Sequence, residues 1–299
     1  MKVLIGPSSF GQLDPAPLKM LENAGLEIVP NPFSRRYNKE ETIELLQGID
    51  GLIAGLEPLD REVLEKTQLK ALSRCGSGMS NVDQQAADDL GVKVSNTPDG
   101  PTQSVAEMTL AGLLSTLRMI PQMNSSLHAG KWDKRIGSLL QGKTLAIIGF
   151  GRIGERFASL LVPFNVTILA VDLYRQEFPA NIQSVSLEEA CKQADIISLH
   201  LSGDECLFTA KEFALCQKGL VFLNAARGGN VDEKSLCDAL DNGTVASAWL
   251  DSLPCEPYDG PLQNYEQVLL TPHTSSYTRE GRLSMETECA QNLIKDLLP

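Results

Sequence analysis

Two series of short apolar runs that alternate with helix-like stretches dominate the sequence. The first series lies within residues 1–98 and includes "KVLI", "LEIV", "GLIAGL" and "KALSR", with helix-like stretches between them. The second begins at Lys143 and includes "KTLAIIG", "VTILAV", "DIISLH", "LVFLN", "VASAWL" and "VLLT". Such alternation is typical of βαβ units and parallel sheets. We therefore predict an α/β fold with two doubly wound parallel-sheet domains.

The boundary between the two domains is predicted near residue 98. The segment "NTPDGPTQ", residues 96–103, is dense in turn-forming residues and precedes the helix-like stretch "SVAEMTLAGLLSTLRMI". The last stretch, "SMETECAQNLIKDLLP", has a helical pattern and we expect it to pack on the first domain. The predicted division is residues 1–98 plus 274–299 for one domain and 99–273 for the other. Two domains connected twice would form a ligand-binding cleft.

Composition and charge restrict the classes of partner. Hydrophobic residues make up 42% and charged residues 21% of the chain, as in ordinary soluble proteins. The formal net charge of −12 repels phosphate backbones and disfavours nucleic acid. No apolar run approaches the roughly 20 residues that a membrane helix needs, and "MKVLIGPSSF" is typical of a first strand, not of a signal peptide. We expect a cytoplasmic protein with no nucleic-acid or membrane partner.

The cysteines argue against a metal site. There are seven, an odd number, and no two form a C-x-x-C pair. A disulfide framework or a zinc site is therefore disfavoured, and we expect reduced thiols and no bound metal.

A glycine-rich motif in "LAIIGFGRIGERF" predicts a phosphate-binding loop. Gly149, Gly151 and Gly154 match G-x-G-x-x-G between an apolar strand and a helix that starts near Arg152. The first glycine permits the tight turn, the second allows close approach of a pyrophosphate, and the third allows the helix to pack on the strand. The N-terminus of the helix then offers free N–H groups to the phosphates. Alternatively, the glycines serve only helix–strand packing.

The strand after this loop, "VTILAVD", ends in Asp172, 18 residues beyond Gly154. A carboxylate there can accept hydrogen bonds from the adenosine ribose hydroxyls and repel a 2′-phosphate. The sequence therefore favours NAD over NADP, although the nearby Arg175 weakens the preference.

Three polar side chains follow strands of the second series. Arg227 comes after "LVFLNAA", Glu256 after "VASAWLDSLPC" and His273 after "VLLTP". The carboxyl ends of parallel strands share one edge, so these groups are predicted to converge beside the cofactor. The cation is suited to binding a 2-keto acid, and the imidazole is suited to proton exchange. The carboxylate can orient the imidazole. His200, which ends "DIISLH", is better explained as a structural histidine bonded to backbone.

The chain resembles the D-isomer-specific 2-hydroxyacid dehydrogenases, and most closely their phosphoglycerate dehydrogenase branch. The matching stretches are "SRCGSGMSNVD", "NTPDGPTQSVAEMT", "GKW", "LQGKTLAIIGFGRIGERFA", "LNAARGGNVDE", "LDSLPCEP" and "LLTPH". They occur in family order between about residues 70 and 280. The resemblance implies a Rossmann NAD-binding domain and a flavodoxin-like substrate domain. Because the sequence ends at Pro299, we expect a short form without the regulatory serine-binding domain of larger relatives.

The resemblance also implies roles for individual residues. It makes Arg227, Glu256 and His273 the catalytic trio and places Asp251 against the nicotinamide carboxamide. The predicted cofactor-binding residues are Gly149, Gly151, Arg152, Ile153, Gly154, Asp172, Ala225, Asp251 and Ser275. The predicted substrate-binding residues are Arg74 and the loop Gly76, Ser77 and Gly78, whose backbone N–H groups would face the substrate carboxylate.

One departure from the family pattern concerns the substrate. Some phosphoglycerate dehydrogenases carry an arginine just after the strand that matches "GLIAG", where this chain has Ala54 and Gly55, followed by Glu57. One phosphate ligand of that kind is missing, whereas Arg74 could meet a phosphate or a second carboxylate. We therefore predict an NAD-dependent oxidoreductase acting on a D-2-hydroxy acid or its 2-keto partner, phosphoglycerate dehydrogenase-like. A glyoxylate or hydroxypyruvate type of reductase is the alternative.

A second alternative is a non-enzymatic NAD(H)-sensing scaffold, against which the presence of all three catalytic groups argues. By resemblance, the helix after Ser104 and the arm through Trp132 would form a homodimer contact. Lys134 or Arg135 on that arm would then reach the substrate cleft of the neighbouring subunit.

Overall fold

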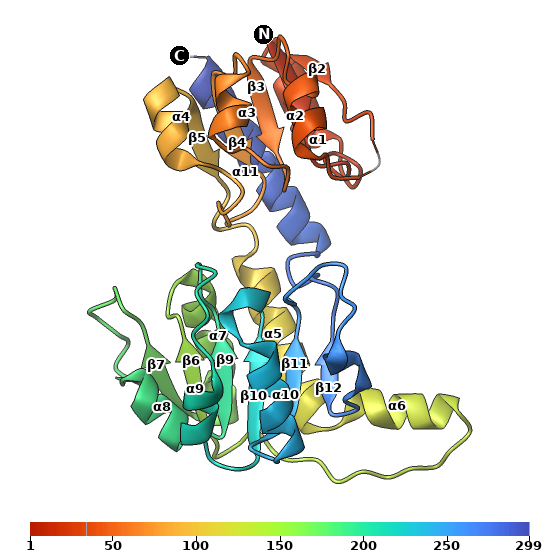
Figure 1. Cartoon of the computed structure of the whole chain (residues 1–299), viewed down its shortest axis with the longest axis vertical. Coiled ribbons are helices and arrows are strands. Elements are labelled where there is room, and N and C mark those ends of the chain that lie inside the picture. The colour runs from red at the N-terminus through yellow and green to blue at the C-terminus, as the bar shows by residue number, and fades with distance from the viewer. Residues whose placement is uncertain (34, 299) are drawn as a thin grey trace. The chain divides into compact units, whose positions relative to one another are not determined.

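The computed structural model describes residues 1–33 and 35–298, which form two compact units (Figure 1). Unit 1 comprises Met1–Thr102 and Ser276–Pro299, and unit 2 comprises Gln103–Ser275. The sequence-based boundaries near residues 98 and 273 thus differ from the structural ones by four and two residues.

The strands of unit 1 are β1 Lys2–Ile5, β2 Glu27–Val29, β3 Gly51–Ala54, β4 Ala71–Arg74 and β5 Lys93–Asn96. Its helices are α1 Ala16–Asn23, α2 Lys39–Leu45, α3 Arg61–Glu65, α4 Gln84–Leu90 and α11 Arg279–Leu297. The strands of unit 2 are β6 Thr144–Ile148, β7 Thr167–Val171, β8 Ile182–Ser184, β9 Ile196–Leu199, β10 Leu220–Asn224, β11 Val245–Leu250 and β12 Val268–Leu270. Its α-helices are α5 Thr102–Leu117, α6 Ile120–His128, α7 Arg152–Leu161, α8 Leu187–Gln193, α9 Ala210–Leu215 and α10 Glu233–Asp241. Short 3₁₀ helices occur at η1 Val162–Phe164, η2 Gly228–Asn230 and η3 Pro261–Asn264.

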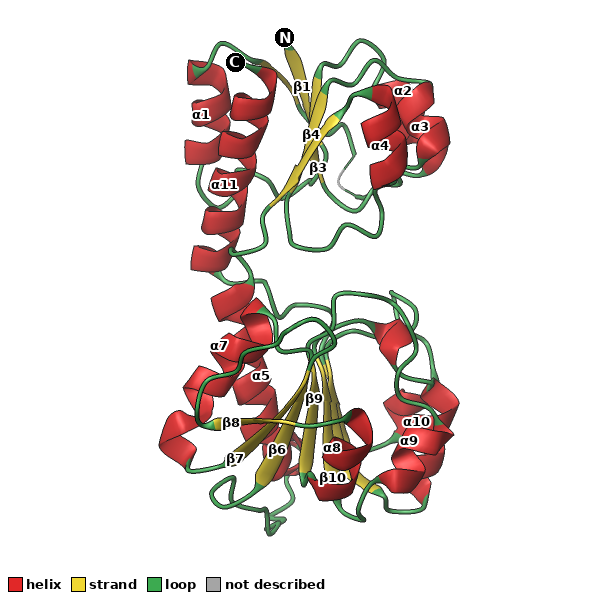
Figure 2. Cartoon of the chain, turned by 90° about the vertical axis from the view of Figure 1, so that its left-hand side faces the viewer, coloured by secondary structure: helices red, strands yellow, loops and turns green. Residues whose placement is uncertain are grey.

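Unit 1 has the flavodoxin-like strand order. Its five strands are all parallel and run β2-β1-β3-β4-β5. Helices α1 and α11 cover one face of this sheet and α2, α3 and α4 cover the other (Figure 2). The buried strand residues Leu4, Leu52 and Leu72 face one helical layer, and Val3, Ile53 and Ala71 face the other. This alternation is the period of two expected of a sheet buried on both faces.

Unit 2 contains a larger parallel sheet of seven strands in the order β12-β11-β10-β9-β6-β7-β8. The unit's first strand, β6, lies inside the sheet, with β7 and β8 on one side and β9 to β12 on the other. Strand order reverses between β6 and β9, which is where doubly wound sheets bind nucleotides. Helices α5 and α7 pack on one face around Phe157 and Trp249, and α8, α9 and α10 pack on the other around Phe208 and Phe222 (Figure 2). The predicted α/β fold with two doubly wound domains is confirmed.

Three elements differ from the sequence-based expectation. The predicted helix through residue 120 ends at Leu117, because Met119 adopts a left-handed conformation (φ 54°) and Pro121 lies in the first turn of a new helix, α6. Strands β5 and β8, which the sequence analysis did not predict, are edge strands with partly exposed side chains. Their short, polar sequences lack an apolar run, and pairing with a neighbouring strand determines their conformation.

The buried Glu286 carboxylate links α11 to the loop after β1. The Glu286 side chain is 1% exposed, lies 2.6 Å from Arg282 Nη2, and accepts the Gly11 N–H at 2.9 Å. Glu286→Ala leaves both donors without this acceptor. We expect the free energy of unfolding to fall by about 3–5 kcal/mol, measured by urea denaturation. The matched control Gln291→Ala removes an exposed side chain of the same helix and should change it by less than about 0.5 kcal/mol. Equal midpoints for the two variants would contradict the assigned role.

Candidate active site

Most of the predicted site residues lie in loops at the carboxyl edge of the unit 2 sheet. The phosphate loop follows β6, and Asp172 follows β7. Arg227, Glu256 and His273 follow β10, β11 and β12. Because the seven strands are parallel, all of these segments leave the sheet at the same edge.

The glycines of the phosphate loop serve two purposes: packing within the chain and space for a ligand. Gly149 has φ +91°, and a Cβ there would lie 2.6 Å from the His200 carbonyl oxygen. A Cβ on Gly154 would collide with the Gly149 carbonyl, so both of these glycines are required by packing within the chain. Gly151 has an ordinary φ of −78°, and nothing lies within 4 Å of its Cβ position. The space beside Gly151 is therefore open, which suits close approach of a pyrophosphate.

Helix α7 begins directly after Gly151, with Arg152 exposed and Ile153 half-buried in its first turn. The first N–H groups of a helix have no intrahelical acceptor and carry the positive end of the helix dipole. The loop and helix together thus form a site suited to the phosphates of a dinucleotide.

Asp172 is held as a carboxylate by backbone donors. Burial opposes its ionisation, but N–H groups of Tyr174 and Arg175 donate to Oδ1 at 2.9 and 3.0 Å, and that of Phe150 donates to Oδ2 at 2.7 Å. Together with the Arg175 charge, these bonds outweigh burial and hold the pKa of Asp172 below its usual value. A charged acceptor therefore lies next to the phosphate loop, at the position where a ribose is bound in this fold.

His273 and Glu256 form a hydrogen-bonded pair. His273 Nδ1 lies 2.9 Å from Glu256 Oε1 and 3.0 Å from Oε2, and each side chain is 44% exposed. The carboxylate accepts the proton on Nδ1, so that Nε2 is the ring atom left to meet another molecule. The His273 backbone has φ 51°, in the left-handed region where non-glycine residues are uncommon.

Asp251 positions the His273 loop. Its carboxylate is 1% exposed and accepts the Thr271 hydroxyl at 2.6 Å and the N–H groups of Thr274 and Ser275 at 3.0 and 2.8 Å. Its carbonyl oxygen accepts the His273 N–H at 2.9 Å. Four donors from one loop thus converge on a single residue at the end of β11. This role adds to the expected one, in which Asp251 faces the nicotinamide.

The Ser275 hydroxyl is buried without a hydrogen-bond partner in the part of the chain that the structure describes. Since buried polar groups are normally paired, this orphaned hydroxyl fits the predicted contact of Ser275 with a polar ligand such as the cofactor.

Arg227 is presented by a turn that two buried asparagines stabilise. Asn224 donates to the Arg227 carbonyl at 2.8 Å, and Asn230 accepts the Arg227 N–H at 3.0 Å. The guanidinium itself donates to the Ala226 carbonyl at 2.8 Å and lies 3.8 Å from Asp204. Neither asparagine was predicted from the sequence, although their place beside the glycines of "LNAARGGN" was a usable signal.

The loop that carries Arg227 also packs against the loop that leads to Glu256. Ser252 donates to the Ala226 carbonyl at 3.1 Å, and a Cβ on Gly228 would collide with Leu253. Ala225 lies half-buried at the start of the Arg227 turn. The structure therefore joins the loops after β10 and β11, although no hydrogen bond links Arg227 to His273 or Glu256 among the described residues.

His200 is a neutral, partly buried residue. Its ring is bonded to the Ser198 hydroxyl at 2.9 Å and lies 5.4 Å from the Phe157 ring, so the expected ring bond to backbone is wrong. Burial lowers the pKa of His200 to about 3, and it adds no positive charge beside the phosphate loop.

The predicted substrate loop lies in unit 1, after β4. Gly76 has φ +139° and donates its N–H to the Thr97 hydroxyl at 2.7 Å, which corrects the expectation that this group is offered to a substrate. The N–H groups of Ser77 and Gly78 have no acceptor among residues 1–33 and 35–298. Arg74 folds over Gly76 and donates to the carbonyl of the following residue.

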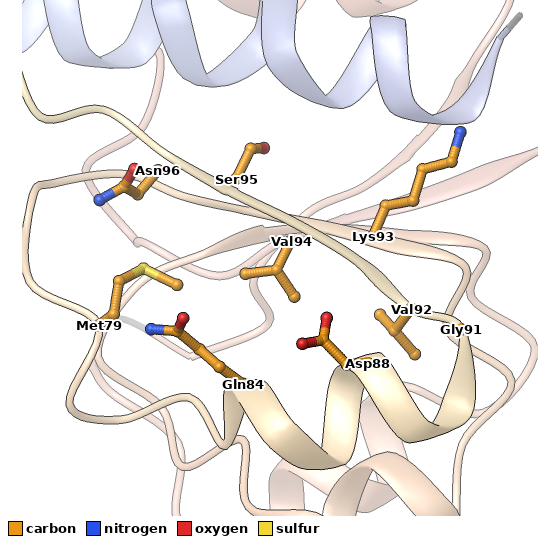
Figure 3. A pocket seen from close by; sticks show the side chains of 9 residues that line it. All are labelled: Met79, Gln84, Asp88, Gly91, Val92, Lys93, Val94, Ser95 and Asn96. Carbon is orange, nitrogen blue, oxygen red and sulfur yellow. The ribbon is translucent and has the colours of Figure 1, made fainter.

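A surface groove of about 520 Å³ also lies in unit 1, between α4 and the edge strand β5 (Figure 3). Its lining residues are Met79, Gln84, Asp88, Gly91, Val92, Lys93, Val94, Ser95 and Asn96. None of the predicted site residues lines it.

The described residues contain neither a candidate metal site nor a membrane-spanning helix. In the described ranges, no three His, Cys, Asp or Glu side chains are grouped so that they could hold a metal ion. Among the same residues, no helix has the length and apolar character needed to cross a membrane.

Comparison with known proteins assigns the family. Residues 110–275 match the model for the D-isomer specific 2-hydroxyacid dehydrogenase NAD binding domain. D-3-phosphoglycerate dehydrogenase of Rattus norvegicus is 36% identical over 98% of the chain, but the match spans only 56% of that enzyme. Hydroxypyruvate reductase of Thermotoga maritima is 32% identical over 88% of the chain and 90% of its own length.

A solved structure is similar over the whole chain. The TT0316 protein from Thermus thermophilus is 31% identical with a TM-score of 0.90, covering 99% of this chain and 97% of its own. The resemblance predicted from the sequence is confirmed: the chain belongs to the D-isomer specific 2-hydroxyacid dehydrogenase family, and residues 110–275 form its NAD-binding domain.

Proposed function

We propose that the protein is an NAD-dependent dehydrogenase that interconverts a D-2-hydroxy acid and its 2-keto acid, in the manner of phosphoglycerate dehydrogenase. The observation that carries the proposal is the His273–Glu256 pair, at the same sheet edge as the phosphate loop. Proton exchange at an imidazole beside a nicotinamide site is the chemistry that alcohol–ketone interconversion requires.

His273 and Glu256 divide the proton chemistry. NAD supplies hydride transfer at the substrate carbon when it is bound. In the reducing direction, His273 Nε2 donates a proton to the oxygen of the substrate carbonyl, and the ring returns to neutrality. In the oxidising direction, Nε2 accepts the hydroxyl proton. Glu256, bonded to Nδ1, stabilises the imidazolium and fixes the ring orientation.

Arg227 is the proposed partner of the substrate carboxylate in unit 2. A guanidinium binds a carboxylate through two parallel hydrogen bonds and polarises an adjacent carbonyl. The side chain of Arg227 is 28% exposed, so it can reach a bound molecule. In unit 1, the N–H groups of Ser77 and Gly78 have no acceptor among the described residues, which supports their predicted role as substrate donors.

The open question about the substrate is whether its side chain is phosphorylated. Arg74, beside the Ser77–Gly78 loop, supports an anionic side chain such as a phosphate, and the phosphoglycerate dehydrogenase relatives support the same substrate class. The similarity to a hydroxypyruvate reductase, over 90% of that enzyme, supports an unphosphorylated 2-keto acid as the alternative. A panel of phosphorylated and plain 2-keto acids, assayed by NADH oxidation, distinguishes them. Turnover of neither class would contradict the proposed function.

The proposed assembly is a cytoplasmic homodimer. The arm that follows α5 exposes large apolar side chains: Ile120, Leu127, Trp132, Ile136 and Leu139. Trp132 is 80% and Ile136 is 96% exposed within one chain, and such a concentration marks an interaction surface. Arg135 is paired with Glu266 at 2.6 Å, which leaves Lys134 as the better candidate to reach a neighbouring subunit.

Removal of the proton carrier tests the mechanism. We expect His273→Ala to lower kcat for keto-acid-dependent NADH oxidation by about 10²- to 10⁴-fold, with NADH affinity retained. Glu256→Gln should also lower kcat, because a neutral partner stabilises the imidazolium less. The control Glu188→Gln alters only an exposed pair with Lys192 and should be active. A wild-type rate in His273→Ala would remove His273 from the mechanism.

Charge introduced into the arm tests the assembly. Trp132→Asp combined with Ile136→Asp should weaken association by at least about 30-fold, because each buries a charge in an apolar interface. Light scattering after size exclusion would then report a monomer at concentrations where the native chain is dimeric. Val162→Asp, at another exposed apolar position 62% exposed, is the matched control. A monomeric native chain would refute the proposed dimer.

A further inference from the structure

Arg175 is a cation beside the ribose-binding carboxylate, and Glu155 holds it. Nη1 lies 2.8 Å from Glu155 Oε2, and Nη2 lies 3.0 Å from Glu155 Oε1. This two-point geometry is the strongest arrangement available to a guanidinium and a carboxylate. Arg175 lies three residues beyond Asp172, whereas Glu155 directly follows Gly154 in the first turn of α7.

Further contacts restrain the same guanidinium. Nε donates to the Glu177 carbonyl at 2.7 Å, and Nη1 donates to the Phe150 carbonyl at 3.1 Å. The group also lies 5.1 Å from the centre of the Phe150 ring, within the range of a cation–π contact. Four of the five donors of Arg175 are therefore engaged, two of them by the Glu155 carboxylate.

The position of this pair matters for the choice of cofactor. NADP differs from NAD by a phosphate on the 2′-oxygen of the adenosine ribose, and an arginine near the acid at the end of the second strand is the usual hydrogen-bond donor to it. Arg175 is placed to serve as such a cation. Glu155 neutralises its charge and occupies its paired donors.

We propose that Glu155 is a specificity-determining residue that withholds Arg175 from a ribose 2′-phosphate, so that the site binds NAD and rejects NADP. The inference rests on the proposed function, because it assigns a dinucleotide to this loop. It adds a second barrier to that of the Asp172 carboxylate, which acts by direct repulsion. Charge-assisted bonding to Arg175 also holds the pKa of Glu155 below its usual value, so Glu155 carries its charge at neutral pH.

The pair is not explained by folding stability alone. The side chains of Arg175 and Glu155 are 28% and 47% exposed, and exposed pairs contribute little to stability. We expect the Arg175–Glu155 pair to change the binding free energy of a nearby doubly charged phosphate more than it changes the free energy of unfolding.

Calorimetric binding without catalysis tests the proposal. The probes are NAD⁺ and NADP⁺, together with 5′-AMP and 2′,5′-ADP, which isolate the 2′-phosphate from the nicotinamide. Glu155→Gln should tighten binding of NADP⁺ and 2′,5′-ADP by about fivefold, equivalent to about 1 kcal/mol. Binding of NAD⁺ and 5′-AMP should change by less than about twofold. Glu188→Gln, which removes an exposed charge on α8, should leave all four affinities unchanged.

A second variant separates release of Arg175 from simple loss of a negative charge. Glu155→Gln combined with Arg175→Ala should show no tightening for the 2′-phosphate probes relative to Arg175→Ala alone. The tightening in the single variant should also diminish at high salt. Unchanged NADP⁺ affinity in Glu155→Gln, or tightening that persists in the double variant, would overturn the proposal. If the native chain binds NAD⁺ but either of these two results is found, only the role of Glu155 is refuted. If the native chain binds no dinucleotide, the proposed function is refuted as well.

Discussion

The buried carboxylate of Asp251 is the interaction on which the candidate active site most depends. It joins the end of β11 to the loop after β12 through the Thr271 hydroxyl and two backbone N–H groups. Hydrogen bonds to a charged acceptor are stronger than neutral ones, and at 1% exposure they have little competition from water. They offset the left-handed backbone of His273, a conformation that costs of order 1–3 kcal/mol and that recurs at functional sites.

Much of this arrangement could be predicted from the sequence. The alternation of apolar runs with helical stretches determines two parallel sheets, and in a parallel sheet the residues after successive strands must share an edge. Arg227, Glu256 and His273 could therefore be selected by position, before any distance was known. The same holds for Gly149 and Gly154, because strand, turn and helix are contiguous in the chain.

Other features depended on partners distant in the sequence. The Glu286 carboxylate is bonded to Gly11, and the Gly76 N–H is taken by Thr97, so neither pairing follows from a local pattern. Likewise, the left-handed conformation of Met119 is not typical of its residue type, so the end of α5 at Leu117 was missed. Strands β5 and β8 were not predicted for a related reason, because edge pairing stabilises them in the absence of an apolar run.

The charge of the chain places its own constraint on the site. With a net charge of −12, a protein of the proposed function would bind an anionic dinucleotide and an anionic acid against an unfavourable overall field. The phosphate loop meets this demand with backbone N–H groups and a helix dipole, which attract phosphate without a formal charge. Arg227, at the carboxyl edge of the sheet, is a proposed cation for the acid, whereas the charge of Arg175 is neutralised by Glu155. On this reasoning, the pairing of Arg175 matters more than its presence, since a free guanidinium there would favour a ribose 2′-phosphate.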